Sequence, residues 1–272
     1  ILIIKKFLLY NIKHIYFTLC LLISIFFVNQ SSANSFTEDY LYDVQLGNIS
    51  VGKSVVSVLI KGNEIRVSAK TKSEGFLDLF YNYESELITN SYKEENIWKA
   101  DNFLVNGILN SNKRYTNVNW PKNNKELYYR TIPILDLKKV YNVSKSSLKN
   151  VIDPITAILK VIENIKKESP CDIKLRIFDG RRRYDLLTKH LGKTFLKNDR
   201  PKSFSGNAII CGIKIIPLGG HRRNSKWQPE EDQFSDFKMF FGRTTSGALF
   251  PVRVSLERWF GIVTVRLLKS NL

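Results

Sequence analysis

Short runs of alternating apolar and polar residues recur along most of the chain, and turn residues separate them. The runs at 40–46, 55–60 and 65–69 are early examples, and Gly62-Asn63 joins the last two. Such runs are typical of strands connected by hairpins. The sequence therefore predicts an antiparallel sheet as its main structure.

The pattern continues to the end of the chain. Residues 76–87 suit a strand or a short helix, and further strands are predicted at 104–109, 127–130, 173–177, 181–187, 194–196, 208–216, 237–241, 251–256 and 262–268. The stretch Asn110 to Glu126 is rich in Asn and Lys, and Gly219 to Asp236 is also polar. Both are expected to be loops or turns.

One helix interrupts the strands. Asp153 is a good N-cap residue, and Pro154 suits the first helical position. Apolar residues then recur at helical spacing, and the helix should end near Lys167, before Pro170. The predicted fold is mainly β: a curved antiparallel sheet or incomplete β-barrel with one packed helix at about 154–167.

The start of the chain resembles a secretory signal peptide. Three lysines precede an apolar run from Ile15 to Val28, and the small residues Ser31-Ser32-Ala33 follow. The run has 14 residues, whereas a membrane-spanning helix needs about 20. We therefore expect a cleaved signal at 1–33, a single β-rich domain at 34–272 and a periplasmic protein. The alternative is an uncleaved anchor in the inner membrane.

Two cysteines remain after such a cleavage, Cys171 and Cys211. Export to an oxidising compartment favours a disulfide between them over two buried thiols. His190 and His221 do not complete a metal-binding spacing with the cysteines, so we expect no metal site. No other cofactor is expected.

The chain is strongly basic, with a formal net charge of +17, and the excess is concentrated near its end. Residues 171–272 hold 20 Lys and Arg against 9 Asp and Glu. A concentrated positive field attracts polyanions. For an exported protein these are anionic lipids or acidic polysaccharides rather than nucleic acid, and peripheral contact with a membrane is compatible with this charge. A basic surface of solvated lysines is the alternative.

A basic hairpin follows the helix. Residues 173–177 alternate, Asp179-Gly180 predicts a two-residue type I′ turn, and 181–187 returns. Consecutive residues of a strand face opposite ways, so Arg181, Arg182 and Arg183 cannot all be solvated on one face. A buried arginine needs an anionic partner. An internal carboxylate from Asp172 or Asp185 is favoured over a ligand, for which the candidate anion-binding residues are Arg176, Arg181, Arg182 and Arg183.

Searches for catalytic motifs identify no catalytic residue. Gly47 to Ser54 has the spacing of a phosphate-binding P-loop, but residues 55–60 after it predict a strand where that motif requires a helix. Two Ser-x-x-Lys sequences, at 50–53 and 146–149, lack the companion motifs of penicillin-binding enzymes. The interpretation of Gly47 to Ser54 is therefore a strand–turn–strand.

Several segments together resemble the exported bacterial family called domain of unknown function 3108 (DUF3108). They are 152–158, Cys171 with 177–186, 204–208 leading to Cys211, the strand pair 42–52 and the ending 251–254. The resemblance implies a periplasmic protein of unknown activity and supplies no catalytic residues.

These observations favour a noncatalytic binder or carrier over an enzyme. Its expected ligand is a lipid-like molecule or an anionic polymer of the bacterial envelope. The alternatives are an envelope hydrolase, for which Asp179, Asp185 and His190 would be the first residues to test, and a structural partner in outer-membrane assembly.

Overall fold

The computed structural model describes residues 35–122, 126–167, 170–224, 233–258 and 261–268. The expected signal peptide lies outside these residues. The described part contains thirteen strands, two short 3-10 helices and two α-helices. They are β1 (Ser35–Leu46), β2 (Ile49–Lys61), β3 (Glu64–Ser73), η1 (Gly75–Leu79), β4 (Tyr83–Glu94), β5 (Ile97–Leu109), β6 (Asn112–Asn119), β7 (Tyr128–Ile132), η2 (Lys145–Leu148), α2 (Pro154–Lys166), β8 (Ile173–Phe178), β9 (Arg183–Leu196), β10 (Gly206–Gly219), α3 (Gln233–Asp236), β11 (Phe237–Arg243), β12 (Leu249–Arg258) and β13 (Gly261–Leu267).

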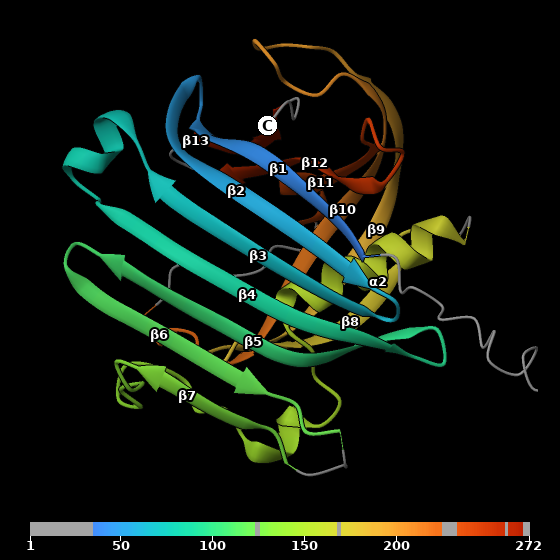
Figure 1. Ribbon diagram of the computed structural model, residues 1–272. Helices are drawn as coiled ribbons and strands as arrows, with labels where there is room; N and C mark the ends of the chain where they lie inside the picture. Colours follow the sequence, from blue (N-terminus) through green and yellow to red (C-terminus); the bar gives the residue numbers. More distant parts are fainter. Residues whose placement is uncertain (1–34, 123–125, 168–169, 225–232, 259–260, 269–272) are drawn as a thin grey trace, which may run out of the picture. The chain divides into compact units, whose positions relative to one another are not determined.

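All thirteen strands belong to one antiparallel sheet, in the order β7-β6-β5-β4-β3-β2-β1-β13-β12-β11-β10-β9-β8. Neighbours in the sheet are also neighbours in the chain, except that β1 pairs with β13 and joins the two halves (Figure 1). The sheet is open, with β7 and β8 at its edges. The predicted mainly β fold, a curved antiparallel sheet with one packed helix, is confirmed.

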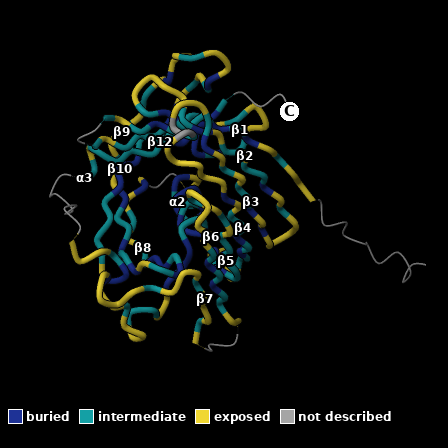
Figure 2. The backbone as a smooth tube through the Cα atoms, turned by 90° about the vertical axis from the view of Figure 1, so that its left-hand side faces the viewer, coloured by how far each residue is buried: buried dark blue, intermediate teal, exposed yellow. Residues whose placement is uncertain are grey.

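Helix α2 begins where the sequence predicts. The Asp153 carboxylate accepts hydrogen bonds from the backbone N–H groups of Ile155 (2.8 Å) and Thr156 (2.9 Å), and Pro154 occupies the first turn. These bonds satisfy donors that a helix N-terminus leaves free. The helix contacts β4, β5, β8 and β12, so it touches both halves of the sheet and lies inside its curve (Figure 2).

The buried side of α2 supplies the centre of the core. Leu159 packs in one cluster with Tyr40 and Val58 from β1 and β2. Ala157 packs in another with Ala100 of β5 and Ile177 of β8. One helix therefore buries apolar side chains from both halves of the sheet.

The two ends of the sheet approach each other through side chains rather than a backbone ladder. Gly180, in the connection between β8 and β9, lies against Thr116 and Val118 of β6. The ring of Tyr129 in β7 meets that of Phe178 in β8 edge-on, with centroids 5.0 Å apart. The outer edge of β8 is occupied by residue 152, which pairs with Ile177. Contacts of this kind complete the closure of the sheet around α2.

The structure corrects two predicted loops. Asn110 to Glu126 was expected to be turn-like, but it contains β6, in which Thr116 and Val118 are buried. The turn itself is the pair Asn110-Ser111, both with positive φ. Asparagine has a low strand propensity, so burial in this strand outweighed composition. The second expected loop, 219–236, contains α3 in its described part.

The predicted type I′ turn at Asp179-Gly180 is wrong. Strand β8 ends at Phe178 and β9 begins at Arg183, so four residues connect them. Only Gly180 has positive φ, at 83°. The Asp179 carboxylate accepts hydrogen bonds from the N–H groups of residues 181 (2.9 Å) and 182 (2.6 Å), which stabilises the longer connection. The first two arginines therefore lie in a loop and not on a strand.

The segment with P-loop spacing forms the hairpin between β1 and β2. Gly47 has a φ of 57° and lies in the turn, and Val55 to Ile60 belongs to β2. The strand–turn–strand interpretation is confirmed for these residues.

Replacing Gly180 by alanine should destabilise the protein by about 2–4 kcal/mol. The new Cβ would collide with Thr116 and lie 3.0 Å from Val118, and the positive φ would add backbone strain. The matched control is Gly62→Ala, in the turn between β2 and β3, where φ is 57° and no atom lies within 4 Å of the new Cβ. It should cost only about 1–2 kcal/mol. Urea unfolding followed by tryptophan fluorescence measures both, and equal losses would contradict the closure at β6.

Candidate functional site

The predicted basic cluster lies at the junction of β8, β9 and the segment before α2. Arg183 is the buried member, with 2% of its surface exposed. Its guanidinium donates to the Asp185 carboxylate (2.7 Å) and to the backbone carbonyl of Ser147 (2.9 Å). Lys174 of β8 approaches the other carboxylate oxygen of Asp185 at 3.1 Å. The buried charge is therefore paired inside the protein, with one of the two carboxylates that the sequence suggested.

Burial acts to raise the pKa of Asp185, but hydrogen bonds from Arg183 and Lys174 outweigh it and hold the pKa below its usual value. The carboxylate is thus kept ionised between two cations. A carboxylate in this state is suited to fastening β8 to β9, and it does not have the raised pKa of a general acid.

The remaining arginines of the cluster also donate to protein acceptors. Arg176 donates to the carbonyl of Ser147 (3.0 Å), and Arg181 donates to the carbonyls of Ile132 (2.6 Å) and Pro133 (3.1 Å). Arg182 is exposed and lies 3.3 Å from the Asp179 carboxylate. The four arginines thus connect loops to strands, and Arg182 is the member most accessible from solvent. Anion binding by the four stays a prediction.

A second charged cluster was missed by sequence reasoning. Asp199 accepts hydrogen bonds from Arg253 of β12 (3.0 Å) and Arg266 of β13 (3.3 Å), and Arg266 also donates to the fully buried Gln45 of β1. Burial acts to raise the pKa of Asp199, but the two arginines lower it overall. These residues come from distant parts of the chain and carry no common motif, so no sequence signal pairs them.

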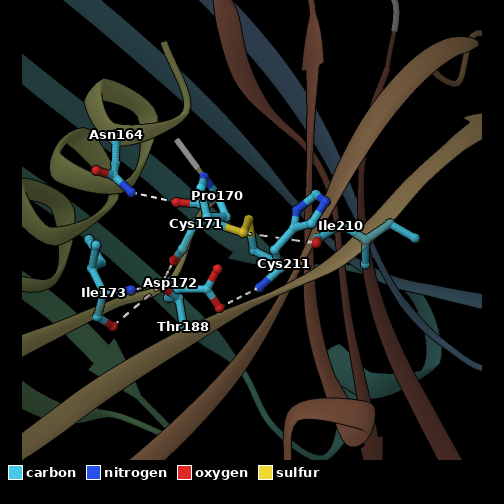
Figure 3. Close-up of a disulfide and its surroundings, with 9 residues drawn as sticks. Asn164, Pro170, Cys171, Asp172, Ile173, Thr188, Ile210 and Cys211 are labelled. Atoms are coloured by element: carbon cyan, nitrogen blue, oxygen red, sulfur yellow. Dashed lines mark hydrogen bonds between the residues drawn. A yellow bond between two sulfur atoms is a disulfide. The ribbon is translucent and has the colours of Figure 1, made fainter. Parts of the chain in front are cut away.

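The structure joins Cys171 and Cys211 in a disulfide, as the sequence predicts, with Cα atoms 6.1 Å apart (Figure 3). Both residues are fully buried in the same core cluster as Val161 and Ile165 of α2. The bond ties β10 to the segment between α2 and β8. Buried next to the helix, it is suited to stabilising the fold.

A polar network surrounds the N-terminus of α2. Asp153 is fully buried and also accepts a hydrogen bond from the Thr89 hydroxyl (3.3 Å), while the hydroxyls of Ser91 and Thr156 lie 2.7 Å apart. Burial raises the pKa of Asp153 despite these hydrogen bonds. The network connects the helix to β4, and its full burial indicates a structural role.

A row of exposed residues runs through the second half of β9 and ends at Lys197, just after the strand. Lys189, Leu191, Lys193, Phe195 and Lys197 are all exposed, and the residues between them are less so. Leu191 is 38% exposed and Phe195 is 61% exposed. We call these five residues the β9 stripe. Strand β8 pairs with β9 only as far as Thr188, so the stripe follows a free part of the sheet edge.

Within the described ranges, no group of three or more His, Cys, Asp or Glu side chains is arranged to hold a metal ion. None of the helices in these ranges has the length and apolarity needed to span a bilayer.

Comparison with known proteins gives a similarity in structure only. No family profile and no curated protein matches the sequence. A solved structure, the beta-barrel-like protein of domain of unknown function DUF1849 from Brucella abortus, is similar with a TM-score of 0.49 and 10% identity, covering 85% of this chain and 95% of that one. The expected membership of DUF3108 is wrong, because no family profile matches the sequence.

The Asp185 carboxylate should make the protein more sensitive to acid. Because its pKa is lowered in the folded state, the unfolded state takes up the proton first as the pH falls from about 5 through the usual aspartate value near 3.9. The contribution of Asp185 to the unfolding free energy is thus fully present above about pH 5 and is lost as the pH falls below the usual aspartate value. Asp185→Asn should flatten the decline of the unfolding free energy between about pH 5 and pH 2.

The control is Asp39→Asn, an exposed carboxylate of β1. Urea unfolding at each pH measures the slopes, and an unchanged slope in Asp185→Asn would refute the paired role of this carboxylate.

Proposed function

We propose that the protein is an exported, noncatalytic binding protein whose β9 stripe attaches to anionic lipid surfaces of the bacterial envelope. One observation carries the proposal: exposed Lys193 and Phe195 lie in the part of β9 that β8 does not cover, with Lys189, Leu191 and Lys197 exposed before and after them in the chain. Lys193 and Phe195 are two apart in the regular part of β9, so they lie about 6.6–6.8 Å apart and face the same way, whereas the register shift between His190 and Gly192 separates them from Lys189. The stripe therefore offers charge and apolar surface together.

The way in which acids and bases pair within residues 171–272 supports the proposal. Three of the six described acids in this segment form ion pairs with cations outside the stripe: Asp179 with Arg182, Asp185 with Arg183 and Lys174, and Asp199 with Arg253 and Arg266. Among the described residues, no ion pair involves the lysines of the β9 stripe. Each lysine near an anionic membrane contributes about 1 kcal/mol of attraction.

Edge protection is the alternative explanation for these lysines, because charges on an edge strand prevent pairing with other chains. Protection does not require exposed Leu191 and Phe195 between the lysines. An aromatic side chain next to basic residues does suit the boundary between headgroups and acyl chains. The apolar members therefore favour membrane attachment.

The β9 stripe is exposed and has no member in the core clusters around α2. Leu159, Ala157 and their neighbours occupy the concave side of the sheet and bury strands from both halves. Binding at the exposed stripe requires no displacement of this core.

Binding should depend on anionic lipid. The purified protein is expected to sediment with vesicles that contain phosphatidylglycerol and to remain in solution with pure phosphatidylcholine vesicles. The double variant Lys193→Glu/Phe195→Ser should partition about tenfold or more weakly, because it loses one lysine attraction and the burial of one phenyl ring.

The matched control is Val55→Ser/Lys70→Glu. These two residues form a cross-strand pair on β2 and β3, and both are exposed. Control binding equal to that of the unchanged protein is expected. Equal binding to both kinds of vesicle, or equal losses in the two double variants, would exclude the β9 stripe as the attachment site.

Export is the second part of the proposal, supported by the signal-like start and the buried cysteine pair. Protein recovered from the periplasm should have the mass of residues 34–272, and its cysteines should resist alkylation until they are reduced. Mass spectrometry before and after iodoacetamide treatment checks both. Cys171→Ser is the control, because it leaves Cys211 free to react once the protein is unfolded. A chain that retains residues 1–33 would indicate the membrane anchor, and free thiols would contradict the oxidised pair.

A further inference from the structure

A cleft of about 250 Å³ lies on the outer face of β2 to β5, in the other half of the sheet from the β9 stripe. The outer face is identified by β3, where Ile65 and Val67 are buried and Arg66 between them is exposed. The lining combines charged, amide and aromatic side chains with a small apolar floor. It consists of Leu59, Lys61, Glu64, Ile65, Arg66, Asn90, Ser91, Tyr92, Asp101 and Lys122.

An irregularity in the sheet builds one wall of the cleft. The pairing of β4 with β5 shifts between Asn90 and Ser91, which leaves Asp101 without a direct partner. The Asp101 carbonyl accepts a hydrogen bond from the N–H of Trp120 (2.9 Å), and this directs the following residues over the sheet. Lys122 then lies with its ammonium 4.7 Å from the centre of the Tyr92 ring. Bulges of this kind re-aim side chains and are common next to binding sites.

The charges of the cleft are available to a ligand. Lys61, Arg66 and Lys122 are cations, and Glu64 and Asp101 are carboxylates. Among the described residues none of the five forms an ion pair. The Arg66 guanidinium donates a hydrogen bond to the side-chain oxygen of Asn90, at 3.3 Å. The site therefore offers donors for an anion next to acceptors for hydroxyl groups.

We infer that this cleft binds an acidic monosaccharide unit. Arg66 and the two lysines match a carboxylate, Asn90 and the two acids match ring hydroxyls, and Tyr92 and Leu59 match the apolar face of a sugar ring. The volume is below the range of roughly 300–1,000 Å³ that is typical of drug-sized ligands, which suits one sugar ring better than a long acyl chain. The inference does not depend on membrane attachment through the β9 stripe.

The test uses methyl glucuronide and methyl glucoside, which differ in one carboxylate. Titration of the isotope-labelled protein should shift amide NMR signals of β3 and β4 at Arg66 and Asn90 with methyl glucuronide and leave them in place with methyl glucoside. Arg66→Gln should raise the dissociation constant for methyl glucuronide about tenfold, the usual effect of losing one charge-assisted hydrogen bond.

The control is Lys70→Gln, which removes a cation from the same face of β3 outside the cleft. It should leave affinity unchanged. Shifts from both sugars, or from neither, would overturn the inference. Equal shifts with inorganic phosphate would show anion binding without sugar recognition and would also overturn the inference. An unchanged circular dichroism spectrum of Arg66→Gln establishes that its weaker binding is not caused by unfolding.

Discussion

The structure depends on the contact of one helix with both halves of a single sheet. Thirteen antiparallel strands leave one broad apolar face that must be removed from water. The side chains of α2 pack against this face, in clusters with residues of strands that include β1 and β8. Its position is set by the buried Asp153, which caps the helix and accepts a hydrogen bond from Thr89 of β4. The cap therefore orients the helix against the sheet as well as starting it.

Arginine and lysine serve different purposes in this basic chain. Arg183, Arg253 and Arg266 are largely buried and bind carboxylates, amides or carbonyls from distant segments, as the planar guanidinium allows. Exposed lysines such as Lys193 remain solvated on the outside. Most of the excess positive charge is therefore on the surface rather than in the interior. The β9 stripe and the sugar cleft are both proposed on that surface.

Local signals predicted local structure well. Asp153 and Pro154 placed the helix start, and the turn at Gly47 identified a hairpin despite its P-loop spacing. Strand β6 was missed because its buried residues alternate with asparagines and basic residues. The long-range pairs were also missed: Gln45, Asp199 and Arg266 meet only because β1 pairs with β13. The β9 stripe and the cleft require exposure and register, which composition does not contain.

The closure between β6, β7 and the β8–β9 connection has a consequence for motion. At every other boundary in the described sheet, separating two strands breaks a row of backbone hydrogen bonds. This seam is made by side chains instead: a glycine contact, one ring pair, the Arg181 hydrogen bonds and the buried cluster of Phe103, Val118 and Phe178. Opening the seam therefore breaks side-chain contacts and no backbone ladder. Amide protons of β7 should therefore exchange with solvent faster than those of β1 and β13. Local opening of the domain is expected to start at this edge of the sheet.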